Sequence, residues 1–496
     1  MENEKTLENE KAVENEKTEG IEHMDTEKNA GTQGESRNSQ ESRNTQELQN
    51  SKISKSFLSY YAETLPVPFY ILLGLFVFSN MLLIICFKEP ISDYIEPARM
   101  VINAILLVLC VMYIAFSLLL WQLKPLPAVI AVGLIVLVGL GWNFIGQTNE
   151  FFCTVVAIFL ALLAYNRDYR VILKIVMVCH IATVLVGAAG LPLGFTELSF
   201  KVGSDDVGYS LGLIYPNHVG RMAFIIFIIA WYLWGQKKKI LTLAAGVALS
   251  AVMWYVIECK TITIFLIAFP VCWIIVDFPA GRTDRKGQIS YVKNSVTQSS
   301  DFQNSDFQSS DTHTANAQRS KSVVGKVFIT IWNSILLTLP FLSMLLTYIL
   351  GKHRLFFMQH WHFGQSLYAL WMRFISAGIL FDVYGFPLFG RDILNEDAPL
   401  EFNSGYLYQA DIIDSAYIYY LIAIGGILLI ACMLWISFGN YRALRNRDYA
   451  LLLIMVFFCG YGLIEIVFFQ FEHNFLVFYP LTVGAMEYKR KRDKEL

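Results

Sequence analysis

The chain is dominated by long apolar runs that are separated by short polar stretches. Runs of about twenty residues, the length that a helix needs to cross the hydrocarbon core of a bilayer, recur along most of the sequence. Twelve can be recognised, the last of them shorter than the rest, and they begin near Phe69, Val101, Pro125, Phe151, Val171, Val219, Ile240, Ile262, Val327, Ser415, Tyr449 and Asn474. The runs lack the even alternation of barrel strands, and backbone polar groups in lipid must be satisfied internally. The pattern therefore predicts an all-α polytopic membrane protein with about twelve transmembrane helices.

Positive charge is concentrated on one side of the predicted membrane. When the polar N-terminal segment is placed inside and the chain alternates through twelve spans, 29 Lys and Arg residues fall inside and 8 fall outside. Lys174 and Arg221 lie within helix ends and complete the total of 39. Because cytoplasmic segments of membrane proteins carry the excess of Lys and Arg, this asymmetry predicts that both ends of the chain are cytoplasmic.

Polar segments divide the predicted spans into groups. The N-terminal segment repeats Glu-Asn-Glu-Lys and has few apolar side chains, so we expect a disordered tail. A later segment repeats Ser-Asp-Phe-Gln and is expected to be a flexible linker. The predicted order is a disordered cytoplasmic tail (residues 1–60), spans one to eight (61–277), a cytoplasmic linker (278–326), spans nine to twelve (327–488) and a basic cytoplasmic tail (489–496). A large extracellular loop, residues 351–413, is expected between the ninth and tenth spans.

Composition agrees with a membrane protein and argues against several enzyme classes. Apolar residues make up 55% of the chain, and Phe (37) and Tyr (25) are abundant, as expected where aromatic rings anchor helices at headgroup level. Seven of the eight cysteines lie in apolar runs, which favours buried thiols over a disulfide framework. Walker A, GxGxxG and GxSxG motifs do not occur in a fitting context. ATP-driven transport, dinucleotide chemistry and serine hydrolysis therefore lack support.

Two charged residues lie at membrane depth, where a charge is costly and therefore informative. Arg221 begins the sixth span, and it either snorkels to the interface or presents its guanidinium group to an anion at the outer leaflet. Glu465 lies about two-thirds of the way through the predicted eleventh span. It must pair with a cation, be protonated or face a wet cavity, and pairing with an arginine is the first expectation.

The predicted outer loop carries the other candidate residues. It is long and rich in aromatic side chains, which favours an ordered, functional segment over a linker. Arg373 lies in an apolar stretch that could lie along the membrane surface or re-enter the membrane. Arg391 lies in a turn-rich segment. Asp414 precedes the tenth span, where it can cap the helix and also serve a site. His360 and His362 are too few ligands to predict a metal site.

Arginines, one or two acids and aromatic rings thus gather at the outer mouth of the predicted bundle. A guanidinium group binds phosphate oxygens through two parallel hydrogen bonds. Aromatic rings stack on the apolar faces of sugars. The pattern is therefore compatible with a glycan that is linked to a lipid through phosphate or pyrophosphate.

Three segments resemble the O-antigen ligase/polymerase family, the Wzy-type polymerases of bacterial surface polysaccharides. Residues 211–220 are similar to the family's Gly-Phe-x-x-Pro-Asn-x-x-Gly run at the start of a helix. Arg373 and the turn at residues 385–392 resemble the arginine that opens the family's large outer loop and its glycine-bearing turn. Residues 414–417, followed by a helix and two glycines, are similar to the family's Asp-Asn-x-Tyr segment.

The chain departs from the family in three places. Cys259-Lys260-Thr261 stands where many relatives have Ser-Arg-Thr, which weakens any role assigned to an arginine there. The glycine turn contains Arg391 in Gly-Arg-Asp instead of Gly-x-Gly. Ligases of the family often have His where this chain has Asp414, and this difference favours a polymerase.

The resemblance implies a GT-C-like, metal-independent glycosyltransferase in the bacterial plasma membrane. Such an enzyme transfers a growing glycan, with inversion, from undecaprenyl pyrophosphate to a sugar hydroxyl of the next lipid-linked repeat unit. Arg373 and Arg221 would stabilise the departing pyrophosphate, and Asp414 would deprotonate or orient the acceptor hydroxyl. His218 is the alternative to Asp414 in that role.

The resemblance also implies further binding residues and partners. The residues expected to bind or position substrate are Asn217, His218, Arg391, Tyr417 and Glu465. The expected partners are the lipid-linked oligosaccharide, membrane lipids and chain-length regulator or flippase proteins, with no metal, cofactor or nucleic acid. A ligase of the same family and a transporter of lipid-linked sugars remain as alternative functions.

Overall fold

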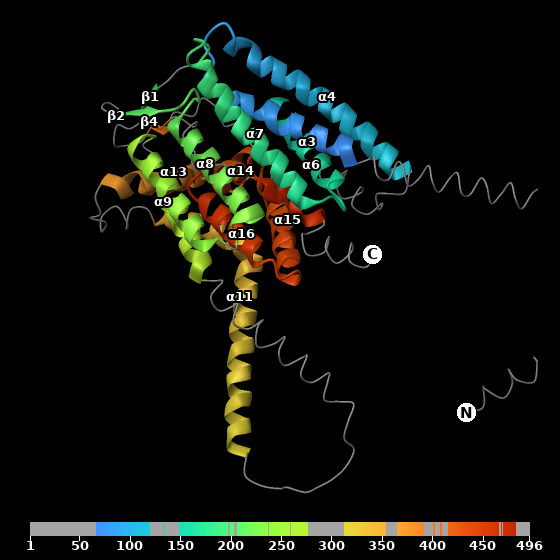
Figure 1. Ribbon diagram of the computed structural model, residues 1–496, viewed down its shortest axis with the longest axis vertical. Helices are drawn as coiled ribbons and strands as arrows, with labels where there is room; N and C mark the ends of the chain where they lie inside the picture. Colours follow the sequence, from blue (N-terminus) through green and yellow to red (C-terminus); the bar gives the residue numbers. More distant parts are fainter. Residues whose placement is uncertain are drawn as a thin grey trace, which may run out of the picture. The chain divides into compact units, whose positions relative to one another are not determined.

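In the computed structural model, the described part of the chain consists mostly of helices (Figure 1). The structure describes residues 66–119, 133, 148–196, 199–202, 206–236, 238–257, 259–275, 312–353, 365–390, 400–401, 407–408, 415–465, 468 and 470–482. The chain separates into the compact units Met1–Val67 and Pro68–Leu496. All of the elements below belong to the second unit, apart from the first two residues of the first described helix.

The described α-helices are α3 (Pro66–Met81), α4 (Ser92–Leu119), α6 (Thr148–Leu163), α7 (Tyr169–Gly190), α8 (Pro216–Ala230), α9 (Lys239–Tyr255), a helix over Lys260–Ile275, α11 (Thr312–Lys352), α13 (Gln365–Tyr384), α14 (Ala416–Ala423), α15 (Gly426–Arg445) and α16 (Tyr449–Tyr461). Shorter helical segments are the 3-10 helices η1 (Leu82–Ile84) and η5 (Phe475–Leu481) and the π-helix η2 (Trp231–Gly235), which continues α8. Two short antiparallel pairs join β1 (Ser199–Val202) to β2 (Asp206–Tyr209) and β3 (Leu400–Glu401) to β4 (Leu407–Tyr408).

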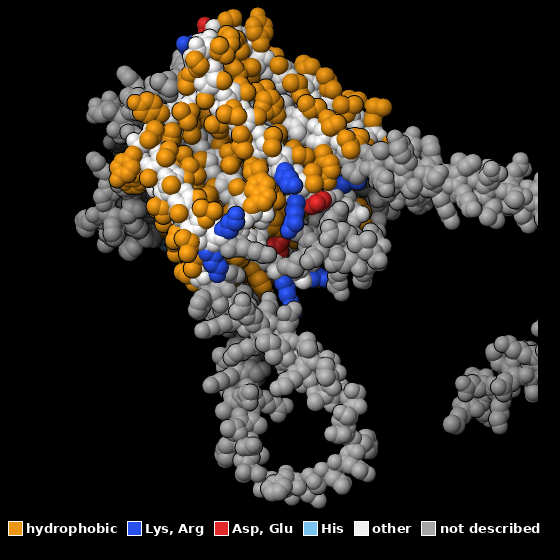
Figure 2. Space-filling model, viewed as in Figure 1, with side chains coloured by type: hydrophobic (Ala, Val, Ile, Leu, Met, Phe, Trp, Pro, Cys, Tyr) orange, Lys and Arg blue, Asp and Glu red, His pale blue; other side chains and the backbone are white. Residues whose placement is uncertain are grey.

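Six of the described helical segments are long and apolar enough to cross a bilayer: Val67–Ile84, Ser92–Ser117, Tyr169–Gly190, Pro216–Gly235, Thr330–Lys352 and Gly426–Arg445. On α4, the side chains of Val101, Ile105, Val108 and Met112 follow one face of the helix and are 54–65% exposed. Apolar side chains also cover most of the face seen in Figure 2. An exposed apolar surface of this extent is suited to lipid. The prediction of an α-helical, membrane-embedded protein is confirmed.

Other apolar runs also form helices, although shorter ones. Cys153–Leu163, Lys239–Tyr255, Lys260–Ile275 and Tyr449–Tyr461 coincide with four further runs. The run that begins near Pro125 lies outside the described residues, apart from Gly133. The number of membrane crossings and the orientation of the two ends therefore stay predictions.

The structure describes the first part of the predicted twelfth span, which begins near Asn474. Its described part is η5, whose residues 475–479 are buried. η5 packs against α15, α6 and α7. Seven residues of 3-10 helix rise about 14 Å, which is roughly half of the hydrocarbon core. The apolar side chains of η5 therefore fill the protein interior, a use that hydropathy does not distinguish from contact with lipid.

The predicted tenth span is interrupted at Gly425, between α14 and α15. Gly425 has a φ of +90°, and a Cβ atom there would lie 2.5 Å from the carbonyl oxygen of Leu388. Non-helical backbone at membrane depth needs partners from the protein. The turn at residues 385–390 supplies one partner, because the N–H of Gly426 donates to the carbonyl oxygen of Pro387 at 2.8 Å.

The predicted eleventh span is interrupted as well. α16 ends at Tyr461, and the described residues of the following stretch, 462–474, form no α-helix. We call this stretch the irregular segment. Glu465 therefore lies beyond the helix end and not within a continuous span, which corrects its predicted position.

Basic side chains gather at one end of the bundle (Figure 2). Arg170 lies at the start of α7 and Arg445 at the end of α15. Asp448 caps α16 at the same end, and it accepts a hydrogen bond of 2.6 Å from the hydroxyl of Tyr232 in η2. Burial raises the pKa of Asp448 above its ordinary value. Arg221 lies about 8 Å from the start of α8 and about 20 Å from the end of η2, so it is nearer the opposite end.

A reciprocal pair of amides joins α3 to α4. Asn80 Nδ2 donates to Asn103 Oδ1 at 3.2 Å, and Asn103 Nδ2 donates to Asn80 Oδ1 at 3.1 Å. Both residues are buried. Polar pairs of this kind stabilise helix contacts in lipid because an unpaired amide there is costly.

Candidate functional site

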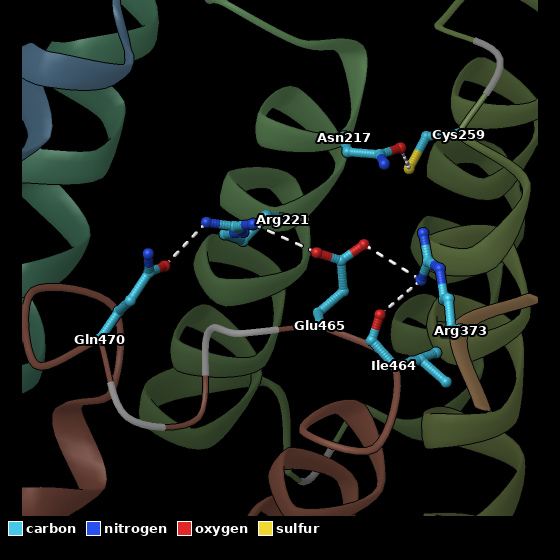
Figure 3. A network of polar contacts seen from close by, with 7 residues as sticks. All are labelled: Asn217, Arg221, Cys259, Arg373, Ile464, Glu465 and Gln470. Carbon is cyan, nitrogen blue, oxygen red and sulfur yellow. Dashed lines mark hydrogen bonds and ion pairs between the residues drawn. The ribbon is translucent and has the colours of Figure 1, made fainter. Parts of the chain in front are cut away.

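Two arginines from different helices meet at one carboxylate (Figure 3). Arg221 Nη2 lies 3.2 Å from Glu465 Oε2, and Arg373 Nη1 lies 3.2 Å from Glu465 Oε1. We call these three residues the Arg–Glu–Arg cluster. The first expectation for Glu465, pairing with an arginine, is confirmed, and the carboxylate is shared by two of them.

The Arg–Glu–Arg cluster is buried, and its two guanidinium groups and one carboxylate together carry a formal charge of +1. The exposed fractions of the side chains are 4% for Arg221, 12% for Arg373 and 7% for Glu465. Arg221 therefore does not snorkel to the interface, which was one of its two predicted roles. Because a buried charge is costly unless it is paired, an anion that reaches this cluster would be bound favourably.

Each member of the cluster comes from an element that fixes its position. Arg221 lies on the second turn of α8, a helix that begins with Pro216, a residue suited to the first turn. Arg373 lies on α13, which packs against α11 and α14. Glu465 follows α16, and its backbone N–H donates to the carbonyl oxygen of Tyr461 at 3.0 Å.

The irregular segment supplies two further contacts to the arginines (Figure 3). Arg373 Nη1 donates to the carbonyl oxygen of Ile464 at 2.6 Å, and Arg221 Nη1 donates to Gln470 Oε1 at 2.9 Å. Arg221 Nε is buried and has no hydrogen-bond partner among the described residues. A buried donor of a charged group is costly to leave unpaired. This N–H is therefore a candidate contact for a ligand oxygen.

Asn217 lies one turn before Arg221, at the start of α8 (Figure 3). Its side-chain oxygen accepts a hydrogen bond from the thiol of Cys259 at 3.4 Å. Burial raises the pKa of Cys259 to about 11, so that the thiol keeps its proton and can donate. Asn217 itself is exposed, so its amide remains accessible.

Three histidines lie on the elements around Arg221. His218 packs its ring against Tyr215, and its buried Nδ1 has no hydrogen-bond partner among the described residues. His180 on α7 and His473 in the irregular segment are both buried, and their rings are joined by an Nε2–Nδ1 contact of 3.3 Å. His180 Nδ1 lies 2.8 Å from the carbonyl oxygen of Val176, so this nitrogen carries the hydrogen. In the neutral pair, His473 Nδ1 must then donate to His180.

The structure places Tyr417 in the packing around the irregular segment. Tyr417 is fully buried, and its hydroxyl donates to the carbonyl oxygen of Cys459 at 3.2 Å. Its ring packs against Phe468 with a centroid separation of 5.4 Å. These contacts support the bend after α16, and they tie Tyr417 to the segment that carries Glu465.

Two predicted site residues, Arg391 and Asp414, lie outside the described residues, so their roles stay predictions. Sequence reasoning missed Gln470, His180 and His473. A histidine in an apolar run was the available signal for His180, whereas nothing in the order of residues indicated that Gln470 would face Arg221. Among the described residues, no three His, Cys, Asp or Glu side chains gather in a group that could hold a metal ion.

Comparison of the chain with known protein families, with curated proteins and with solved structures gives no match. The candidate site therefore has to be interpreted from its own chemistry. It offers two guanidinium groups, an excess positive charge and a position within an apolar bundle.

Proposed function

We propose that the protein is a membrane glycosyltransferase that polymerises lipid-linked oligosaccharide repeat units. The observation that supports this proposal most strongly is the Arg–Glu–Arg cluster, in which two buried guanidinium groups share one carboxylate. An excess positive charge among lipid-embedded helices suits a ligand with an anionic group on an apolar tether. Undecaprenyl pyrophosphate that carries a glycan has both features.

The proposed reaction is a displacement at the anomeric carbon of the donor glycan. The hydroxyl oxygen of the acceptor sugar forms the new bond to this carbon, and the bond from the carbon to the pyrophosphate oxygen breaks. The hydroxyl proton passes to a base, for which Asp414 is the candidate and His218 the alternative. Attack on the face opposite the leaving group inverts the configuration.

The arginines would act on the leaving group. Negative charge builds up on the pyrophosphate as its bond to the sugar breaks, and donors that are already in place stabilise that charge without reorganisation. Arg221 and Arg373 are held by protein contacts before any substrate is bound. This arrangement favours a leaving-group role over a role for either arginine as a proton acceptor.

The proposal includes an orientation in a bacterial plasma membrane. The chain would cross twelve times, with both ends in the cytoplasm and the loop of residues 351–413 outside. The Arg–Glu–Arg cluster would then lie toward the outer leaflet. Donor and acceptor lipids could reach it laterally, between helices.

The test uses purified full-length protein in lipid nanodiscs with lipid-linked repeat units. Arg221→Gln and Arg373→Gln should each lower the elongation rate about 100-fold or more, because each removes one charged donor from the transition state. Arg445→Gln is the matched control, since Arg445 is exposed at the end of α15. Unchanged elongation by both site variants would refute the assignment of the site.

A transporter of lipid-linked sugars is the second candidate function. Irregular backbone with polar side chains at membrane depth is also typical of transporter binding sites, and the irregular segment carries Glu465, Gln470 and His473. Cells without the protein distinguish the two functions. Single repeat units on the surface indicate loss of a polymerase, whereas units that accumulate inside indicate loss of a transporter. A ligase would differ only in its product, a finished polymer on another acceptor.

A further inference from the structure

Glu465 is anchored through both its backbone and its side chain. Its N–H binds the carbonyl oxygen of Tyr461 at 3.0 Å, and its two carboxylate oxygens bind Arg221 and Arg373 at 3.2 Å each. The adjacent carbonyl oxygen of Ile464 accepts a hydrogen bond from Arg373 at 2.6 Å. The same short stretch of backbone therefore contacts both the cluster and the helix that precedes it.

We infer that Glu465 is a positioning residue, whose carboxylate holds Arg221 and Arg373 side by side at a spacing that serves the two phosphate groups of one diphosphate. This inference rests on the proposed function. Two buried guanidinium groups repel each other, and the carboxylate between them offsets that repulsion. Because each oxygen contacts a different arginine, the carboxylate also determines their separation.

Gln470 completes the orientation of Arg221. Its amide oxygen accepts from Arg221 Nη1 at 2.9 Å, while Glu465 occupies Nη2 at 3.2 Å. Nε remains as the buried donor without a hydrogen-bond partner among the described residues. With both terminal nitrogens held by the irregular segment, the free Nε–H has a defined direction, which an incoming phosphate oxygen can use.

The inference makes a distinction that net charge alone does not make. Glu465→Gln raises the charge of the cluster from one to two positive charges while keeping the size of the side chain. If Glu465 acted only as a counter-ion, the variant would bind an anion more tightly and react at least as fast. If Glu465 positions the arginines, the variant binds the anion but stabilises the transition state poorly.

The experiment compares wild type, Glu465→Gln and Glu465→Asp in the nanodisc elongation assay, with inorganic pyrophosphate as a competing anion. We expect Glu465→Gln to lower kcat about tenfold or more, since misplacement of groups by about 1 Å has effects of this order. KM for the lipid-linked substrate should not rise, and inhibition by pyrophosphate should not weaken. Glu465→Asp keeps the charge and should recover part of kcat. An unchanged kcat, or an effect on KM alone, would overturn the inference.

A double variant separates geometry from charge even if the single variants fold poorly. Glu465→Gln combined with Gln470→Glu keeps one carboxylate on Arg221 but moves it to the other terminal nitrogen. Positioning predicts a kcat that stays at least tenfold below wild type, whereas recovery of the wild-type kcat would show that charge alone matters and would sink the inference. Failure of the wild-type protein to elongate would instead refute the proposed function, together with this inference.

Discussion

Replacing Glu465 should destabilise the protein more than replacing either of the arginines that it contacts. Glu465→Gln removes the carboxylate that both guanidinium groups contact. Arg221→Met leaves a neutral pair of Arg373 and Glu465 and removes the excess charge. The difference depends on burial, and all three side chains are at most 12% exposed.

The size of the difference can be worked out from these contacts. Removing one partner of a buried ion pair costs about 3–5 kcal/mol, because an uncompensated charge remains. This cost applies to Glu465→Gln. For Arg221→Met the remaining charges balance, and the main loss is the hydrogen bond to Gln470, with a cost of roughly 1–3 kcal/mol. We therefore expect the free energy of unfolding to differ by about 2 kcal/mol between the two variants.

The measurement is reversible unfolding of the purified protein in mixed micelles, by titration with a denaturing detergent and with tryptophan fluorescence as the signal. Arg445→Met, at an exposed position, is the control and should leave the free energy of unfolding within about 0.5 kcal/mol of wild type. Arg373→Met should resemble Arg221→Met. If Arg221→Met proved at least as destabilising as Glu465→Gln, the carboxylate would not be the shared counter-ion of the two arginines.

Three further predictions concern packing and pH. Asn80→Leu should cost about 1–3 kcal/mol by leaving the Asn103 amide unpaired, and Asn80→Leu with Asn103→Leu should recover part of the loss in the same unfolding assay. Gly425→Ala should destabilise by more than about 1 kcal/mol, because its φ is +90° and the new Cβ would clash, whereas at Gly426 the nearest atom would lie 3.4 Å away, so Gly426→Ala should be the milder change. Burial raises the pKa of Asp448 above its ordinary value of 3.8, so the folded state binds this proton more tightly than the unfolded state. The resulting stability should be present below pH 3.8 and be lost as the pH rises through the folded-state pKa. Melting temperatures of Asp448→Asn across this range should depend less on pH than those of the wild type. An identical pH dependence of the two proteins would contradict the assignment of this effect to Asp448.

Part of the candidate site could be predicted because charge at membrane depth is rare. Arg221 and Glu465 stood out as charges in apolar runs, and Arg373 stood out in a loop with unusual aromatic content. Each was recognisable without knowledge of its neighbours. The contact of both arginines with the carboxylate of Glu465 could not be recognised from the sequence, because α8, α13 and the irregular segment are far apart in the chain and only packing brings them together.

Gln470 shows why the rest of the site was missed. It is an uncharged polar residue near the end of an apolar run, and such residues are common at membrane interfaces. Its importance comes from a single contact of 2.9 Å with Arg221. Nothing in local composition reports that distance.

The sequence by itself determined that the chain is helical and embedded in a membrane, because runs of about twenty apolar residues can satisfy their backbone in lipid only as helices. Tertiary structure alone decided where those helices stop. Hydropathy measures the preference of side chains for an apolar environment, and the interior of the protein meets that preference as well as lipid does. The breaks at Gly425 and after Tyr461, and the buried helix η5, are therefore invisible in the apolar pattern. Those breaks bring Glu465 to the two arginines.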